Sequence, residues 1–155
     1  MKRLSLIILN LALLFSAFAQ DYFRLYWEPN ENGNSFTICA TKGQNFTVNW
    51  DLDNPTIQTF TGTGENMYIE YFYDDSIYFP ITVDINAVTY NCRFTHFIAN
   101  NEKITGIVFF DCNELSYLDI RNNSLTYLHL ENCPGLLYLD CSNNNLTGLN
   151  IKKMS

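Results

Sequence analysis

Apolar residues in the second half of the chain recur at a fixed spacing. Units of ten or eleven residues begin with an apolar residue at Phe94, Ile104, Leu115, Leu125, Leu136 and Leu146. Alternate units resemble each other, so the full period is 21 residues in two halves. Positions 1, 4 and 6 of each half are apolar, and positions 4 and 6 follow the two-residue period of a strand. The pattern predicts two short strands per period with their apolar side chains facing inward.

Turn-forming residues separate these units. RNNS, ENCPG and CSNNN interrupt the apolar pattern every ten or eleven residues. Clusters of Asn, Pro and Gly favour turns, and a helix as short as one unit is marginal in water. We therefore expect strands joined by tight turns in this half of the chain.

Asn and Cys residues recur in these turns at the same period. Asn123 and Asn144 are 21 residues apart, and an inward Asn side chain can both donate to and accept from the backbone of a neighbouring unit. Cys112 and Cys133, also 21 apart, occupy the alternate halves, where we expect them to pack as small apolar thiols. Stacked units would also bring this pair close enough for a disulfide, so that alternative stays open. The four residues form a predicted structural ladder.

Two units match a known repeat pattern. LSYLDIRNNSL (115–125) and LLYLDCSNNNL (136–146) fit L-x-x-L-x-L-x-x-N-x-L, the pattern of leucine-rich repeats. Through these units the chain resembles the secreted and surface leucine-rich-repeat proteins of Bacteroidetes-type bacteria. The resemblance implies a short solenoid with a 21-residue period over residues 86–155, with clear units from 94 to 155. The first unit departs from the pattern, since Glu102 holds the position of Asn144.

Residues 20–85 carry a different pattern. Short segments rich in aromatic and β-branched residues alternate with turn sequences, and they read YFRLYW, SFTICA, FTVNW, IQTF, MYIEYFY and IYFPITV. This alternation predicts a small antiparallel, sandwich-like β-domain, so the whole chain is predicted to be mainly β.

The family resemblance implies that this domain is Ig-like or PKD-like. NFTVNWDLDN is similar to the V-x-W-G-D-G hairpin of such domains, with Leu52 to Asn54 in place of its glycine-containing turn. We expect the last strand of this domain to bond to the first repeat unit and to cover that end of the repeats, because an open end would expose strand edges and leucines.

The first 19 residues have the composition of a signal peptide. Lys2 and Arg3 precede an apolar run from Leu4 to Phe15, and Ala17 to Ala19 form an A-x-A-like cleavage site. The apolar run is short for a spanning helix, so we expect no membrane span after its removal. The mature protein is expected to be secreted, periplasmic or on the cell surface.

Charge narrows the range of partners. Without the signal peptide, seven basic residues remain against 16 acidic ones, a net charge of -9. Nucleic acid is therefore not an expected partner. The acidic excess lies almost entirely in residues 20–85, which supports two regions of different construction.

The candidate site follows from the strand period. Positions 3 and 5 of the units that precede the Asn turns should project outward as two parallel columns, and they include His96, Tyr117, Asp119, Tyr138 and Asp140. Tyr is favoured at interfaces, so these five residues predict a recognition strip for a protein or glycan at the cell envelope or a host surface. The alternative is that Tyr and Asp are merely tolerated on an exposed strand.

Catalysis and cofactors are not expected. The period places His96 and His129 on different faces and turns the repeat cysteines inward, which leaves no exposed nucleophile beside a base. Asp51, Asp53, Asp74 and Asp75 read as solvated acidic loops rather than a calcium site. We expect no enzyme activity, no metal and no cofactor.

A structural role is the rival hypothesis. The last unit, LTGLNIKKMS, has no further unit after it in the sequence pattern. The open end of the repeats would then serve self-association, as a homodimer, or the repeats would act as a spacer.

Overall fold

A computed structural model of the chain describes residues 20–30, 33–53, 55–73 and 80–151. The predicted signal peptide, residues 1–19, lies outside the described residues. The strands are β1 (Tyr22–Trp27), β2 (Asn34–Ala40), β3 (Asn45–Asn49), β4 (Ile57–Thr61), β5 (Asn66–Tyr71), β6 (Ile81–Ala87), β7 (Phe94–Ile98), β8 (Ile104–Phe110), β9 (Tyr117–Asp119), β10 (Tyr127–His129), β11 (Tyr138–Asp140) and β12 (Gly148–Asn150). In this part of the chain, no helix is long and apolar enough to cross a membrane.

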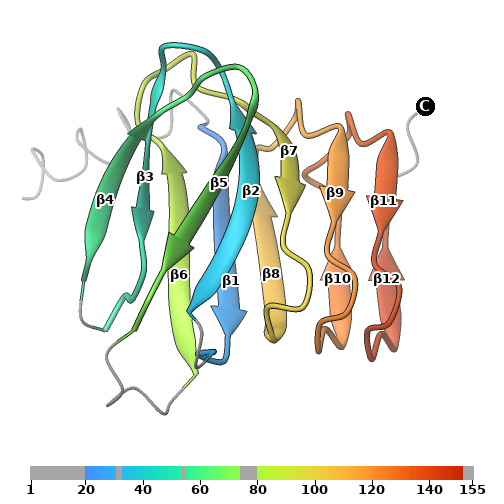
Figure 1. Cartoon of the computed structure of the whole chain (residues 1–155). Helices are drawn as coiled ribbons and strands as arrows, with labels where there is room; N and C mark the ends of the chain where they lie inside the picture. Colours follow the sequence, from blue (N-terminus) through green and yellow to red (C-terminus); the bar gives the residue numbers. More distant parts are fainter. Residues whose placement is uncertain (1–19, 31–32, 54, 74–79, 152–155) are drawn as a thin grey trace, which may run out of the picture.

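The strands form two layers that lie face to face (Figure 1). One layer contains a sheet of order β4-β3-β6-β1-β8, and the pair β10-β12 continues this layer beside β8 (Figure 1). The other layer is a sheet of order β11-β9-β7-β2-β5. The expected mainly β class, with antiparallel sheets, is confirmed.

The first five segments expected to be strands in residues 20–85 coincide closely with β1 to β5, whereas the sixth, IYFPITV (77–83), overlaps only the start of β6 and begins outside the described residues. In β1 and β3 the residues alternate between the core and the surface, as a two-residue period requires, whereas β2 and β6 each contain three consecutive buried residues and β4 is mostly exposed. In β1, Phe23, Leu25 and Trp27 are fully buried while the residues between them are at least partly exposed. All pairings among β1 to β6 are antiparallel.

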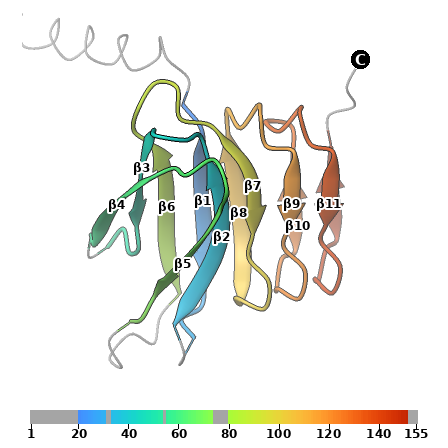
Figure 2. The ribbon, with the colours of Figure 1, turned by 45° about the horizontal axis from the view of Figure 1, so that its top comes forward.

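The junction with the second half differs from the expectation. β6 was expected to bond to the first repeat unit, but it lies inside its sheet between β3 and β1, which occupy both of its edges. Two antiparallel strand pairs join the two halves of the chain instead: β1 with β8, and β2 with β7. Both sheets therefore run without interruption across the predicted boundary at residues 85 and 86 (Figure 2).

Three strand pairs, β7 with β9, β9 with β11 and β10 with β12, are parallel and follow the 21-residue period. β9 pairs with β7 and with β11, so that Tyr117 lies between His96 and Tyr138. In the opposite layer β10 pairs with β12, with Tyr127 beside Gly148. The register is the one that the apolar spacing predicts.

One hydrophobic core fills the space between the layers. The ring of Phe23 contacts Phe94, Phe97 and Phe109 at centroid distances of 5.0 to 5.1 Å, so an aromatic cluster spans the junction. The core continues through leucines such as Leu118 and Leu128, which are fully buried. Leu149 was expected to be inward and buried, yet it is 45% exposed, because no described residue packs beyond β12.

Candidate functional site

The Asn ladder holds successive turns together. Asn123 Oδ1 accepts hydrogen bonds from the backbone N–H of Glu102 (3.1 Å) and Ile104 (3.0 Å), and its Nδ2 donates to the carbonyls of Ala99 (2.7 Å) and Ile120 (3.0 Å). Every one of these bonds ties the turn of Asn123 to its own strand or to the preceding period. Asn123 thus satisfies backbone groups in two successive turns.

Asn144 repeats the arrangement one period later. Its Oδ1 accepts from Leu125 N (3.0 Å), and its Nδ2 donates to the carbonyls of Ile120 (2.9 Å) and Cys141 (3.0 Å). Asn144 is only partly buried, whereas Asn123 is 8% exposed. Asn144 thus makes the same kinds of backbone contact one period later.

Glu102 is the first member of this ladder, which the sequence pattern did not predict. Its carboxylate accepts from Ser35 N (2.9 Å) and Ser35 Oγ (2.7 Å) at the start of β2. Asn34, fully buried, donates to the backbone carbonyl of Glu102 (2.9 Å). At this ladder position Glu102 contacts the strand β2, whereas Asn123 and Asn144 contact another turn of the same shape. The longer Glu side chain is therefore the one that fits here.

The cysteines line the core as free thiols. Cys92 and Cys112 are fully buried and Cys133 is 4% exposed, so all three thiols lie in the core. The Cys112 Sγ donates to the carbonyl of Phe110 (3.2 Å). Burial raises the pKa of Cys92 to about 11 and the pKa of Cys112 far above its ordinary value, so these thiols stay protonated.

A stack of three rings forms the first column of the predicted strip. The rings of His96 and Tyr117 are 5.5 Å apart at 25°, and those of Tyr117 and Tyr138 are 4.2 Å apart at 4°. A hydrogen bond with Tyr117 is the main cause that raises the pKa of Tyr138. Tyr138 is 42% exposed and the other two rings are partly exposed. Because each ring covers the next, His96 and Tyr117 present mainly their edges to solvent, whereas Tyr138, on the edge strand β11, has a ring neighbour on one side only.

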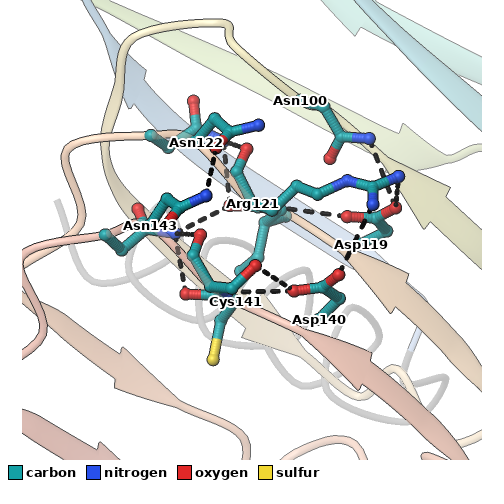
Figure 3. A network of polar contacts seen from close by, with 11 residues as sticks. Asn100, Asp119, Arg121, Asn122, Asp140, Cys141 and Asn143 are labelled. Atoms are coloured by element: carbon teal, nitrogen blue, oxygen red, sulfur yellow. Dashed lines mark hydrogen bonds and ion pairs between the residues drawn. The ribbon is translucent and has the colours of Figure 1, made fainter.

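Asp119, expected to project outward, is buried, with only 3% of its side chain exposed. Its Oδ2 lies 3.0 Å from Arg121 Nη2 and accepts a hydrogen bond from Asn100 Nδ2 at 3.2 Å. The cause is local: the turn after β9 places Asn122 in the left-handed region, at φ 56°, and Arg121 folds back over the strand end (Figure 3). Asp119 is therefore an internal anchor and not a contact residue.

Arg121 is the exposed charge that the sequence pattern missed. Its side chain is 46% exposed and bridges two carboxylates, because Nη1 also lies 3.7 Å from Asp140 Oδ2 (Figure 3). Asp140 Oδ1 accepts from Ser142 Oγ (2.6 Å) and Ser142 N (3.0 Å), and these bonds are the main cause that lowers the pKa of Asp140. A basic residue two positions after Asp119 was the only signal in the sequence.

Cys39 is a second neighbour of the strip that sequence reasoning missed. The antiparallel register of β2 and β7 places Cys39 directly across from His96. Cys39 is 8% exposed, so its thiol is largely withdrawn from solvent. Cys39 and His96 are neighbours because β2 pairs with β7, two segments more than 50 residues apart, and no local sequence pattern predicts that pairing.

The opposite layer carries a similar but separate pair of rings. Tyr127 and His129 lie 4.4 Å apart, and the Tyr127 ring fills the space over Gly148, where a Cβ would come within 2.0 Å of the ring. His129 is in β10 and His96 in β7, so the two histidines lie in different sheets, as the period predicts. Within the described ranges, no group of three or more His, Cys, Asp or Glu residues is placed to hold a metal ion. Asp74 and Asp75 lie outside those ranges.

The site that results is a face of the β7-β9-β11 edge of one sheet, which we call the ring face. It comprises His96, Tyr117, Arg121, Tyr138 and Asp140. Three rings, one cation and one anion are held in fixed register by backbone pairing and by the buried Asp119 beneath them. Searches for a matching protein family, a similar curated protein and a similar solved structure each find none.

Proposed function

We propose that the protein is a non-catalytic, extracytoplasmic binding module that recognises a partner protein through the ring face. In this proposal, residues 86–155 form a short leucine-rich-repeat solenoid of the Bacteroidetes type behind an Ig-like or PKD-like domain. The signal-like N-terminal sequence supports an exported location. The parallel strands at a 21-residue register and the ladder of Asn123 and Asn144 support the repeat assignment.

The observation that carries the proposal is the parallel stack of Tyr117 on Tyr138. A stack at 4.2 Å and 4° fixes both rings before any partner arrives, so little side-chain entropy is lost on binding. Tyr and Arg are residue types enriched at interface hot spots, and the ring face contains both. Asp140 and Arg121 add a charge of each sign beside the hydroxyl edge.

The geometry favours a protein over a glycan. Recognition of a sugar by an aromatic residue uses an open ring face. Both faces of Tyr117 are covered by His96 and Tyr138, which leaves only the outer face of Tyr138, on the edge strand β11, for such a contact. Ring edges, hydroxyl groups and a mixed pair of charges instead suit the polar and aromatic contacts of a protein interface. A glycan ligand is the competing outcome of the test below.

The test compares the ring face with its counterpart in the other layer. Purified protein is screened against extracellular and envelope protein fractions and against a glycan array, and the affinity for the partner found is then measured by calorimetry. Replacing both Tyr117 and Tyr138 by Ala should weaken binding at least about 100-fold, since two hot-spot residues are removed. Tyr127→Ala is the matched control, because the Tyr127 ring also lies beside a His ring, at 4.4 Å, and is similarly exposed. Unchanged affinity in the double variant, or binding only to glycans, would contradict the proposal.

A further inference from the structure

The strands β11 and β12 present apolar side chains at one end of the molecule. Leu137 is 83% exposed, Ile151 54% and Leu149 45%, whereas Leu128 and Leu130, one period before Leu149 and Ile151, are at most 1% exposed. Among the described residues, no strand pairs with the outer edge of β11 or β12 (Figure 1). Apolar side chains and free backbone edges thus occur together in both layers.

Leu137 is apolar at a position of the repeat that is polar in the earlier periods. The equivalent residues one and two periods earlier are Ser116 and Thr95, and Ser116 Oγ donates to the Thr95 carbonyl at 3.1 Å. Leu137 N donates to the Ser116 carbonyl at 2.9 Å, so the backbone follows the same path while the hydroxyl is replaced by a leucine side chain. The outermost unit is therefore apolar at a position where the inner units are polar. This is the composition of a surface that meets a partner rather than water.

The charges on this edge favour an antiparallel partner strand. Parallel pairing of β9 with β11 sets Asp119 beside Asp140, and Arg121 bridges the two carboxylates from the inner side. Another Tyr-Leu-Asp strand added in parallel would set a further carboxylate beside Asp140, and like charges directly opposite destabilise a sheet. In an antiparallel pair centred on Leu139, Tyr138 of each copy lies across from Asp140 of the other. A phenol hydroxyl can then donate to a carboxylate at each of the two places.

We propose that the occupant of this edge is a second copy of the chain, joined through antiparallel pairing of β11 with β11 about a two-fold axis at Leu139. Leu137 of each copy then lies across from Cys141 of the other, so the exposed leucine meets an apolar neighbour. A two-fold contact uses the same edge of both copies and closes at two. The contact shares Tyr138 and Asp140 with the ring face, whereas His96, Tyr117 and Arg121 take no part in it.

The experiment measures the mass of the purified protein by size-exclusion chromatography with light scattering over a concentration series. We expect a dimer. Leu137→Ser should raise its dissociation constant at least about 100-fold, because two leucines leave a buried contact. The variant should fold, since Ser occupies the same position one period earlier, and circular dichroism with a urea melt checks this. Ile57→Ser is the control, because Ile57 is 63% exposed on the edge strand β4 at the other end of the molecule.

A second experiment tests the proposed antiparallel register of β11 with β11. Under mild oxidation, a mixture of the variants Tyr138→Cys and Asp140→Cys should form disulfide-linked heterodimers faster than either variant alone forms homodimers. A protein that stays monomeric throughout the concentration series would overturn the proposal. A dimer that is insensitive to Leu137→Ser, or oligomers larger than two that are lost on Ile57→Ser, would overturn it as well, since the latter indicate head-to-tail assembly.

Discussion

Asn123 is expected to be the most costly of the ladder residues to replace. Its side chain makes four hydrogen bonds of 3.1 Å or less with backbone groups, and Asn123 is 8% exposed. Replacing it by Ala leaves the N–H groups of Glu102 and Ile104 and the carbonyl of Ala99 without that partner, while the carbonyl of Ile120 still accepts from Asn144. Each buried group left unsatisfied costs about 1 to 3 kcal/mol, so with the lower value for each of the three we expect the free energy of unfolding to fall by about 3 kcal/mol.

Asn144 provides the internal comparison. It makes three corresponding bonds of 3.0 Å or less, but it is only partly buried, so water can replace some of them. Asn144→Ala should therefore cost about 1 to 2 kcal/mol. Asn122→Gly is the control, because Asn122 is exposed, and glycine keeps its positive φ of 56° while removing the side chain. We expect that change to stay within about 0.5 kcal/mol.

The assay is urea unfolding of the three variants beside the parent protein. The comparison holds if the urea dependence of the free energy, the m-value, is unchanged between them, since a changed m-value signals a different unfolded or native state. A loss for Asn123→Ala of less than about 1 kcal/mol, or a loss smaller than that of Asn144→Ala, would refute the reasoning. Either result would mean that the turns hold their shape without the ladder.

Three further changes test other parts of the fold. Burial is the main cause that raises the pKa of Asp21 to about 6, so the folded protein holds a proton that the unfolded chain releases near 3.8. Stability should fall as pH rises from about 4 to 6, by up to about 3 kcal/mol, and a urea series over pH should show this loss reduced in Asp21→Asn. In the native protein a thiol reagent should modify Cys141 first, since the other cysteines are buried, and urea should release the rest. Arg121→Met should destabilise the protein by about 1 to 3 kcal/mol in urea melts, because Asp119 then stays buried without its cation, whereas Lys42→Met on an exposed turn should be neutral.

The parts of the structure with local periodicity could be predicted from the sequence. The short aromatic and β-branched segments located β1 to β5 and the start of β6, and the 21-residue spacing set Tyr117 beside Tyr138. The junction between the two halves could not be predicted. β1 and β8 are about 80 residues apart, and nothing in the sequence of either apolar strand indicates that it pairs with the other. Strand alternation gave a direction for the Asp119 side chain, but it carries no information about a turn that folds back over it.

The burial of Asp119 changes the character of the proposed site. From the sequence, the strip has two outward carboxylates in a protein of net negative charge. In the structure one carboxylate is internal and recruits Arg121 to the surface, where the cation is 46% exposed and Asp140 has 23% of its side chain exposed. The ring face thus presents opposite charges a few ångströms apart, and their fields largely cancel at a distance of one Debye length. Long-range attraction between charges therefore contributes little to partner choice at this face. Selectivity rests on the short-range fit of the Tyr117 and Tyr138 edges, so ligand association should depend only weakly on salt concentration.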